Sequence, residues 1–377
     1  MTYYLFVLGC QQNYYDAEKI SHLLNKMEYF ESKEKDADLI IVLACSVRQK
    51  PLDRIFGKIK LWKKLPQKPK IVITACVLSH DKKKLENKVD AIIDTKNFQK
   101  EFLSFQKKYF INKRLGVIKY SKLNINKSFN PEKNKSTSYI PIMSGCDNFC
   151  TYCVVPYTRG KEISRPVDDI ISEIKNLVEN GINEVTLLGQ NVNSYYSKSN
   201  LKNQKSKTQI KNLKNGKYNF VQLLREIEKI KGLKKISFLT AHPKDMSDEL
   251  IEWMGVSKKF SHKLHLPVQS GDNEILKKMN RHYTSENYIK LIENLKLKIK
   301  NLNLSTDIIV GFPSETKKQF KNTVKLCKKI NFNQAYVSQY SPRPGTLAST
   351  MKNDVSAKEK KRRWQILNDL INKKRGR

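Results

Sequence analysis

The sequence predicts an α/β protein in which a small parallel, Rossmann-like N-terminal domain precedes a partial (β/α)6 barrel. Three observations support this fold class. Short apolar runs alternate with amphipathic or charged segments along the chain, which is typical of parallel sheets. Many of these runs end directly before Gly, Cys, Asn or Gln. The alternation is interrupted at residues 113–138, a segment rich in lysine and asparagine that we interpret as a linker.

Residues 1–112 are expected to form the first domain. Each of their apolar runs is short enough for a strand: 3–8, 39–44, 71–75 and 89–93. Three of these four runs end at a cysteine, namely Cys10, Cys45 and Cys76. Because parallel strands direct their carboxyl ends to one crevice, we predict that the three thiols form one metal site. Three separate buried cysteines are the alternative, since free cysteine is often buried.

Residues 139–357 are expected to form the barrel. Six apolar runs recur there, at 139–143, 184–188, 235–239, 263–268, 302–310 and 334–339. The clearest intervening helix is 166–180, with Pro at its start, acidic residues in its first turn and Gly181 just past its end. Barrels of this kind place their chemistry in the loops after the strands, and an incomplete barrel leaves an open side for a large substrate.

The loop after the first barrel strand carries Cys146, Cys150 and Cys153 at C-x3-C-x2-C spacing. Three thiolates can hold three irons of a cubane 4Fe-4S cluster and leave the fourth iron open, whereas a structural zinc site uses four protein ligands. A zinc half-site, a disulfide and three buried thiols are the alternatives. Cys327 falls on an apolar helical face with no cysteine nearby, and we predict a structural role for it.

The composition indicates a globular protein with a polyanionic partner. The 377 residues are 39% hydrophobic, enough for a sizeable core, and carry a formal charge of +36. Nucleic acid is the first candidate partner and an anionic membrane surface the second, although a lysine bias from an A/T-rich genome is an alternative explanation. Seven cysteines without a signal peptide indicate a reducing, cytoplasmic location, and no run is long enough to span a membrane.

Residues 145–166, GCDNFCTYCVVPYTRGKEISRP, resemble the cluster loop of the radical S-adenosylmethionine methylthiotransferases. The resemblance implies that Cys146, Cys150 and Cys153 hold a 4Fe-4S cluster whose open iron binds S-adenosylmethionine for cleavage to a 5′-deoxyadenosyl radical. The family commonly continues into a small TRAM-like β-barrel that binds RNA, and we expect that domain to be absent here. The sequence ends instead in a basic segment, 358–377, for which we expect a helix.

The N-terminal cysteine motifs resemble the three motifs that bind an auxiliary 4Fe-4S cluster in this family. Gln12, Ala44 and Ala75 depart from the residues usual there, but every cysteine is kept. The resemblance further implies S-adenosylmethionine contacts at four loop residues, Gln190, Asn191, Gln269 and Gly311. Ordinary turn chemistry is the alternative for these loops. Three histidines near strands are interpreted as core or loop residues: His242, His262 and His265.

Residues 154–160 and 188–195 resemble the isopentenyladenosine branch of the family. The implied activity is methylthiolation of carbon 2 of N6-isopentenyl(dimethylallyl)adenosine at position 37 of tRNA. Such a carbon has no acidic proton, so a radical must abstract its hydrogen before sulfur can add. The alternatives are threonylcarbamoyladenosine in tRNA or a ribosomal-protein aspartate as the substrate, and a non-enzymatic iron–sulfur RNA-binding protein.

The implied partners are tRNA, an electron donor such as a flavodoxin or ferredoxin, and an unidentified sulfur donor, with the chain acting as a monomer away from membranes. Two basic segments are candidates for contacting the RNA. One is the lysine-rich insertion 197–217, for which a solvated loop is the alternative, and the other is 358–377. The sequence does not identify which tRNAs are modified.

Overall fold

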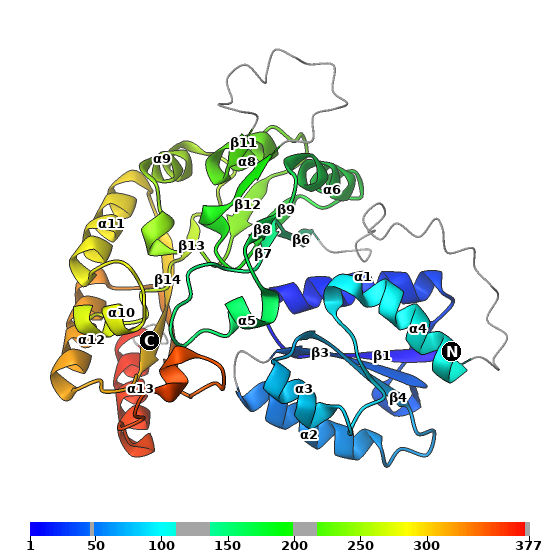
Figure 1. Cartoon of the computed structure of the whole chain (residues 1–377). Helices are drawn as coiled ribbons and strands as arrows, with labels where there is room; N and C mark the ends of the chain where they lie inside the picture. The colour runs from blue at the N-terminus through cyan, green and yellow to red at the C-terminus, as the bar shows by residue number, and fades with distance from the viewer. Residues whose placement is uncertain (46–48, 111–135, 199–216, 374–377) are drawn as a thin grey trace. The chain divides into compact units, whose positions relative to one another are not determined.

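A computed structural model of the chain describes residues 1–45, 49–110, 136–198 and 217–373 (Figure 1). The chain divides into two compact units, Met1–Asn130 and Pro131–Arg377. The boundary between them lies inside 113–138, the segment expected to be a linker, most of which is outside the described residues.

The first unit is a parallel sheet with the strand order β2-β1-β3-β4-β5. Its strands are β1 (Thr2–Val7), β2 (Phe30–Glu31), β3 (Leu39–Cys45), β4 (Lys70–Cys76) and β5 (Ala91–Ile92). Its helices are α1 (Gln11–Lys26), α2 (Gln49–Trp62), α3 (Ser79–Leu85) and α4 (Phe98–Phe110). The parallel α/β prediction is confirmed, and each predicted run overlaps a strand. Strand β2 was not predicted, because two exposed residues are too short to show a period.

The central strand β3 explains why its sequence is a continuous apolar run. Ile41 and Leu43 pack in one hydrophobic core with α1 and α4. Ile40 and Val42 pack in a second core with α2. A parallel strand covered on both faces has no polar side, so alternation is lost from its sequence.

The second unit contains six parallel strands that follow chain order around a partial barrel, as predicted. They are β6 (Thr137–Pro141), β9 (Glu184–Leu188), β12 (Lys235–Phe238), β13 (Lys263–His265), β14 (Asn303–Val310) and β15 (Gln334–Gln339). Strands β6, β9 and β12 form one ladder, and β13, β14 and β15 form another. A parallel bridge between Ile236 and Phe260 connects β12 to the segment that leads into β13.

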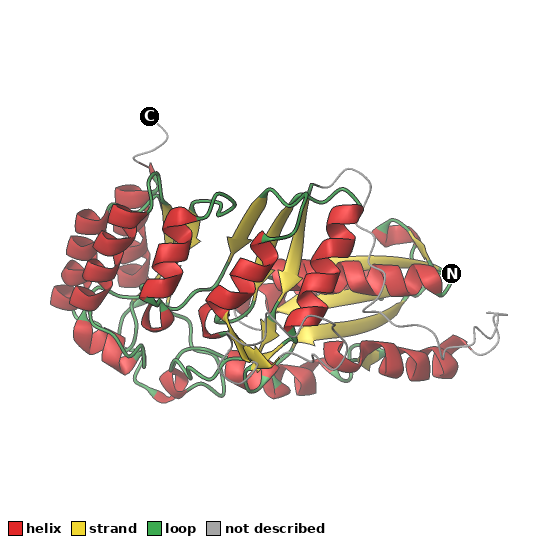
Figure 2. Ribbon diagram, turned by 90° about the horizontal axis from the view of Figure 1, so that it is seen from above, coloured by secondary structure: helices red, strands yellow, loops and turns green. Residues whose placement is uncertain are grey.

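Helices lie on the outside of these barrel strands (Figure 2). They are α6 (Val167–Glu179), α8 (Phe220–Glu228), α9 (Asp248–Val256), α11 (Ser285–Lys298), α12 (Lys317–Ile330) and α13 (Ala357–Ile371). Shorter elements are β7 (Met143–Ser144), α5 (Val155–Arg159), β8 (Ile163–Ser164), β10 (Tyr196–Lys198), β11 (Lys217–Asn219) and α10 (Asn273–Lys278). Cys327 lies on α12 and is 2% exposed, consistent with a structural role.

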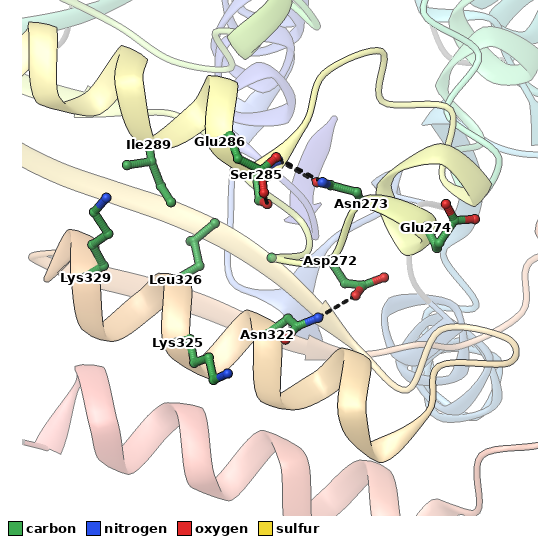
Figure 3. A pocket seen from close by; sticks show the side chains of 11 residues that line it. Asp272, Asn273, Glu274, Ser285, Glu286, Ile289, Asn322, Lys325, Leu326 and Lys329 are labelled. Atoms are coloured by element: carbon green, nitrogen blue, oxygen red, sulfur yellow. Dashed lines mark hydrogen bonds between the residues drawn. The ribbon is translucent and has the colours of Figure 1, made fainter.

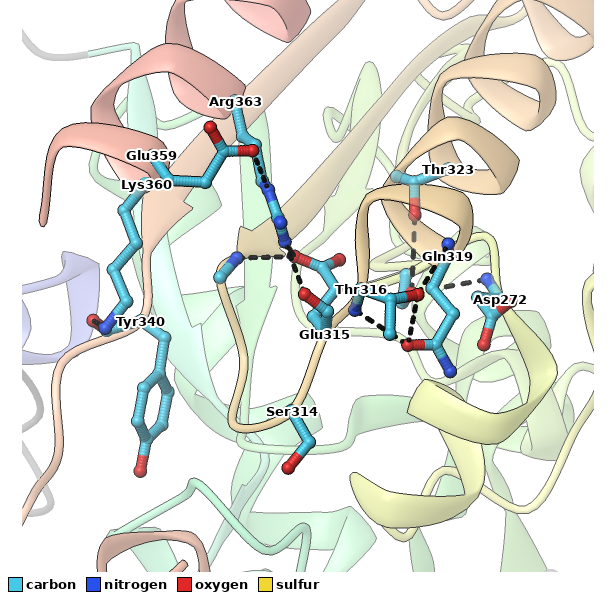
Figure 4. A network of polar contacts seen from close by, with 12 residues as sticks. Asp272, Ser314, Glu315, Thr316, Gln319, Thr323, Tyr340, Glu359, Lys360 and Arg363 are labelled. Carbon is cyan, nitrogen blue, oxygen red and sulfur yellow. Dashed lines mark hydrogen bonds and ion pairs between the residues drawn. The ribbon is translucent and has the colours of Figure 1, made fainter. Parts of the chain in front are cut away.

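A buried ion pair fastens α13 to the loop after β14 (Figure 4). Arg363 Nη1 donates to Glu315 Oε2 at 2.7 Å and to the Glu315 carbonyl at 2.9 Å, and both side chains are at most 3% exposed. Lys360 of the same helix is also buried, and its Nζ donates to the Tyr340 carbonyl at 3.2 Å. Two cations of the basic segment 358–377 are therefore used inside the fold and do not face a partner.

The Arg363–Glu315 pair predicts that losing a buried ion pair lowers the stability of the protein far more than losing an exposed one on the same helix. Glu315→Gln keeps the shape of the side chain but removes the buried carboxylate that Arg363 Nη1 meets. Only Glu359 Oε1, 2.9 Å from Nε, then remains to balance the charge, and the free energy of unfolding should fall by about 3 kcal/mol. Arg362→Gln is the matched control, because Arg362 is 52% exposed and its pair with Glu359 is worth about 0–1 kcal/mol. Urea unfolding followed by circular dichroism measures both, and equal losses would contradict the structural role of the buried pair.

Candidate functional site

The cysteine loop of the barrel is held in a tight, largely buried conformation. Cys146 and Cys150 are each 9% exposed, and the Cys146 N–H donates to the Gly160 carbonyl at 3.2 Å. Gly145 has φ +85°, and a Cβ there would lie 2.0 Å from the Lys161 carbonyl oxygen. Burial raises the pKa of the Cys146 thiol, and that of Cys153 to about 12. Ionisation of these thiols therefore requires a nearby positive charge, which a bound metal supplies.

The segment that follows α10 supports the same loop from the other side. Asn280 Nδ2 donates to the carbonyls of Asn148 and Phe149, both at 3.1 Å. Thr151 Oγ1 donates to the Lys278 carbonyl at 2.8 Å. Phe149 and Asn280 both adopt left-handed φ angles, +46° and +59°. The loop conformation is thus imposed by contacts more than a hundred residues away in the sequence, and the cysteines are positioned before any cofactor arrives.

Four buried side-chain atoms in the strand-end loops have no hydrogen-bond partner among the described residues. They are Gln190 Oε1 and Asn191 Oδ1 after β9, His242 Nε2 after β12, and Gln269 Oε1 after β13. Buried polar atoms are normally paired, so a group of unpaired ones marks a place where a ligand can bind. The sequence predicted Gln190, Asn191 and Gln269 for such a role.

Contacts between the loops bring these residues to one end of the barrel. Asn191 Nδ2 donates to Asp245 Oδ2 at 2.7 Å, which ties the loop after β9 to the loop after β12. The His242 ring packs against Tyr283 with 5.8 Å between centroids, and the Tyr283 hydroxyl donates to the Val268 carbonyl, next to Gln269, at 2.9 Å. Three successive strand ends therefore present unpaired polar atoms together.

His242 is the site residue that sequence reasoning missed. Its Nδ1 accepts the Lys244 N–H at 3.2 Å, which leaves the proton on Nε2. Burial, together with the positive charges of Arg281 and Lys244, lowers the pKa of His242 to about 2. The ring is therefore a neutral donor. A single histidine has no spacing signal, but its position directly after a barrel strand is the same feature that identified the other loop residues.

The remaining histidines and Gly311 have local roles. His262 Nδ1 lies 2.9 Å from the Lys300 carbonyl, and His265 Nδ1 lies 3.0 Å from Ser305 Oγ, so both are loop or strand residues as expected. The Gly311 N–H donates to Glu315 Oε2 at 2.6 Å, and a Cβ at Gly311 would lie 2.3 Å from Lys360 Cγ. These contacts explain the glycine, and its predicted contact with S-adenosylmethionine stays a prediction.

The first unit places its three cysteines at the carboxyl ends of three neighbouring strands. Cys45 and Cys76 are register partners in β3 and β4, and Cys10 lies just beyond β1 at the start of α1. Asn13 is fully buried, and its Nδ2 donates to the Ala44 carbonyl at 3.1 Å. The loop that carries Cys10 is thereby tied to the strand that carries Cys45, as the parallel arrangement predicted.

Comparisons with known proteins give a consistent assignment. Residues 140–327 match the Radical SAM superfamily, and residues 2–94 match Uncharacterized protein family UPF0004. The tRNA-2-methylthio-N(6)-dimethylallyladenosine synthase of Buchnera aphidicola subsp. Schizaphis graminum is 41% identical, over 98% of this chain and 83% of the relative. The enzyme of that name from Carboxydothermus hydrogenoformans is 41% identical with the same coverage. This chain belongs to the radical S-adenosylmethionine methylthiotransferase family.

Solved structures show the same fold at low sequence identity. The methyltransferase TsrM from Kitasatospora setae, a radical S-adenosylmethionine protein, has a TM-score of 0.62 at 12% identity and covers 92% of this chain and 75% of its own. The cobalamin-dependent radical enzyme OxsB has a TM-score of 0.56 at 13% identity, over 99% of this chain and 55% of its own. The predicted family and fold class are confirmed.

The donor sets of this methylthiotransferase fit cubane clusters better than single ions. No three His, Cys, Asp or Glu side chains in the described parts of the chain lie close enough to share one metal ion. A single zinc needs its sulfurs to converge at about 2.3 Å from one point, whereas a cubane binds each cysteine through a different iron. A set of three thiols suits a 4Fe-4S cluster, which binds one cysteine at each of three irons and leaves the fourth iron open.

One pocket, of about 390 Å³, lies elsewhere, among residues in and next to α10, α11 and α12 (Figure 3). None of the six predicted cluster cysteines lines it. Its polar groups pair with one another, since Asn322 Nδ2 donates to Asp272 Oδ2 at 2.8 Å and Asn273 Nδ2 to Glu286 Oε2 at 2.9 Å.

Among the helices that the structure describes, none is long and apolar enough to cross a membrane.

Two glycines of the cysteine loop predict different effects of a change to alanine on the amount of bound iron. Gly145→Ala should remove about half of the bound iron, because its Cβ would lie 2.0 Å from a backbone oxygen and must move the loop that carries one of the two cysteine sets. Gly160→Ala is the matched control: its φ is +78°, but a Cβ there meets nothing within 4 Å. It should cost about 1–3 kcal/mol of backbone strain, because a ψ of −160° at this φ is nearly restricted to glycine, and it should keep its iron. Iron analysis after anaerobic reconstitution checks both, and full loading of Gly145→Ala would contradict the packing argument.

Proposed function

We propose that this chain methylthiolates carbon 2 of N6-dimethylallyladenosine at position 37 of tRNA, next to the anticodon. The observation that carries the proposal is the pair of three-cysteine sets in a chain whose relatives are named for this product. One set lies at the carboxyl ends of three parallel strands, and the other lies in the loop after the first barrel strand. This second set is linked to unpaired polar atoms that suit a small polar ligand, because Arg281 contacts Cys150 and Tyr283, and Tyr283 packs against His242. The formal charge of +36 suits a polyanionic substrate.

The residues divide into three roles. Cys146, Cys150 and Cys153 hold the cluster that works with S-adenosylmethionine, and the N-terminal set holds the auxiliary cluster (Cys10, Cys45 and Cys76). When bound, the two clusters and S-adenosylmethionine would supply the electron, the radical that abstracts hydrogen, the sulfur and the methyl group. The unpaired side-chain oxygens of Gln190, Asn191 and Gln269 accept hydrogen bonds from the ammonium and hydroxyl groups of S-adenosylmethionine. Gly311 contacts the same ligand through its backbone. The neutral His242 donates to an acceptor in the same place.

The alternative functions have less support. The curated relatives considered above are named for the dimethylallyladenosine product and not for threonylcarbamoyladenosine or a ribosomal-protein aspartate. A non-enzymatic iron–sulfur RNA-binding protein would have no use for unpaired buried polar atoms beside the cysteine loop, because leaving each unpaired costs about 1–3 kcal/mol.

The proposal includes partners of defined chemistry. A flavodoxin or ferredoxin supplies the electron, a sulfur donor of unidentified kind resupplies the auxiliary cluster, and the chain works as a monomer in the cytoplasm. The lysine-rich insertion 197–217 stays a candidate for tRNA contact, but residues 199–216 lie outside the described parts of the chain. In the other basic segment, Lys360 and Arg363 are buried, so the RNA contacts there must come from other residues of 358–377.

The two cysteine sets predict separable defects. Replacing Cys10, Cys45 and Cys76 by Ala should keep reductive cleavage of S-adenosylmethionine, because the other set lies in a different unit, yet add no sulfur to tRNA. Replacing Cys146, Cys150 and Cys153 should abolish both activities. Each triple variant should keep about half of the iron, since one cluster of two remains.

Mass spectrometry of tRNA nucleosides provides the measurement, in cells that lack the gene and carry either variant or the wild type. The 2-methylthio derivative of dimethylallyladenosine should appear only with the wild type. Its formation by the variant without the N-terminal cysteines would refute the sulfur-delivery role, and its absence with the wild type would refute the proposed substrate.

The unpaired oxygen of Gln190 predicts how two substitutions change the binding of S-adenosylmethionine, which can be measured without tRNA. Gln190→Met removes the unpaired acceptor with little change of shape and should weaken S-adenosylmethionine binding about tenfold or more, the value of a hydrogen bond to a charged group. Gln190→Glu keeps an acceptor and should bind at least as well, because the ligand is cationic. Equilibrium dialysis with the reconstituted protein gives the dissociation constants; similar weakening by both variants would show that Gln190 acts only in packing.

A further inference from the structure

Arg281 is a buried cation in direct contact with a cysteine of the barrel loop. Its side chain is 4% exposed, and Nη1 lies 3.5 Å from Cys150 Sγ. The other guanidinium nitrogens are also engaged: Nη2 donates to the Pro267 carbonyl at 2.9 Å and Nε to the Tyr283 hydroxyl at 3.0 Å. These two bonds fix the plane of the guanidinium, so the group that faces Cys150 is held in one orientation.

The charge of Arg281 has no carboxylate to balance it. Among the described residues, no Asp or Glu forms an ion pair with this guanidinium. Its neighbours are a backbone carbonyl, the tyrosines Tyr152 and Tyr283, and Cys150. Arginine stays protonated in proteins, and a buried charge without a partner costs several kcal/mol. A tyrosine hydroxyl is neutral near pH 7, so neither tyrosine supplies the negative charge.

Cys150 is the neighbour that becomes anionic when the loop binds metal, because cysteine ligates iron as the thiolate. We propose that Arg281 is the counter-ion of the cluster held by Cys146, Cys150 and Cys153, and that its hydrogen bond to the Cys150 sulfur raises the reduction potential of that cluster. The inference rests on the proposed cluster binding by these three cysteines. It adds a positioning residue that contacts a ligand of the cluster and takes no part in the reaction itself.

The direction of the effect follows from electrostatics. Reduction adds one negative charge to the cluster, and a fixed positive charge with a donor on a ligand sulfur stabilises the more negative state. Removing Arg281 should therefore make the cluster harder to reduce and shift its potential downward. Lysine cannot replace it fully, since it lacks the planar fork that reaches Cys150, Pro267 and Tyr283 at once.

A purely structural role is the competing explanation, because Arg281 also connects the segment after α10 to the end of β13. The metal-free protein separates the two. If Arg281 serves the cluster, Arg281→Met removes an uncompensated buried charge, and the thermal midpoint of the apoprotein should stay the same or rise. If Arg281 serves only the fold, the lost hydrogen bonds should lower that midpoint.

The decisive experiment is a redox titration followed by electron paramagnetic resonance, in a full-length background that lacks Cys10, Cys45 and Cys76 and so holds one cluster. Arg281→Met should shift the midpoint potential downward and Arg281→Lys should shift it less. Lys278→Met is the matched control, since it removes an exposed cation three residues away and should leave the potential unchanged.

Each outcome decides the proposal. An unchanged midpoint potential in iron-loaded Arg281→Met overturns the proposal, and a destabilised apoprotein would then show that Arg281 serves only the fold. If Arg281→Met loads no iron while its apoprotein stays folded, the counter-ion role is supported, and the potential of Arg281→Lys must then still lie below that of the parent. Failure of the parent itself to bind iron would refute the proposed cluster site, a result distinct from any effect of Arg281.

Discussion

The direction of the parallel strands is the constraint on which the rest of this structure depends. Within each unit the carboxyl ends of the parallel strands lie at one edge of that unit, and its three predicted cluster ligands lie there or in the loop that follows. Residues distant in sequence then meet without any local signal, as Asn280 does with the loop at Asn148. The chemistry of the chain is therefore a property of sheet edges.

Unpaired polar groups in the loops after the barrel strands lower the stability of the metal-free chain. Among the residues that the structure describes, four buried polar atoms lack partners there, and no Asp or Glu pairs with Arg281. Arg363 shows the contrast, because it is equally buried but meets Glu315 at 2.7 Å. Buried polar groups without partners are rare in folded proteins, and they occur where a ligand supplies what the protein omits. The metal-free chain is electrostatically incomplete in the region where cofactors are expected.

Net charge is a poor guide to which residues meet RNA. The chain has a formal charge of +36, and its basic C-terminal segment was a candidate RNA surface. Yet Lys360 and Arg363 of that segment point into the fold. Lys360 donates to the Tyr340 carbonyl just after β15, and Arg363 fixes the loop after β14. A cation in a sequence contributes to binding only if the fold leaves it exposed, and amphipathic patterning does not distinguish a buried, paired arginine from a free one.

The sequence by itself determined the parallel α/β fold and the six barrel strands, because apolar runs that alternate with amphipathic segments are local signals. The family followed from the resemblance of residues 145–166, which carry three closely spaced cysteines, and the other three cysteines were grouped because each follows an apolar run. The sequence also marked Gln190, Asn191 and Gln269, since they directly follow strands. Only the tertiary structure decided the rest. That His242 is a neutral donor, that Arg281 reaches Cys150 and that Arg363 is buried against Glu315 depend on contacts between distant segments, which leave no periodic trace in the sequence.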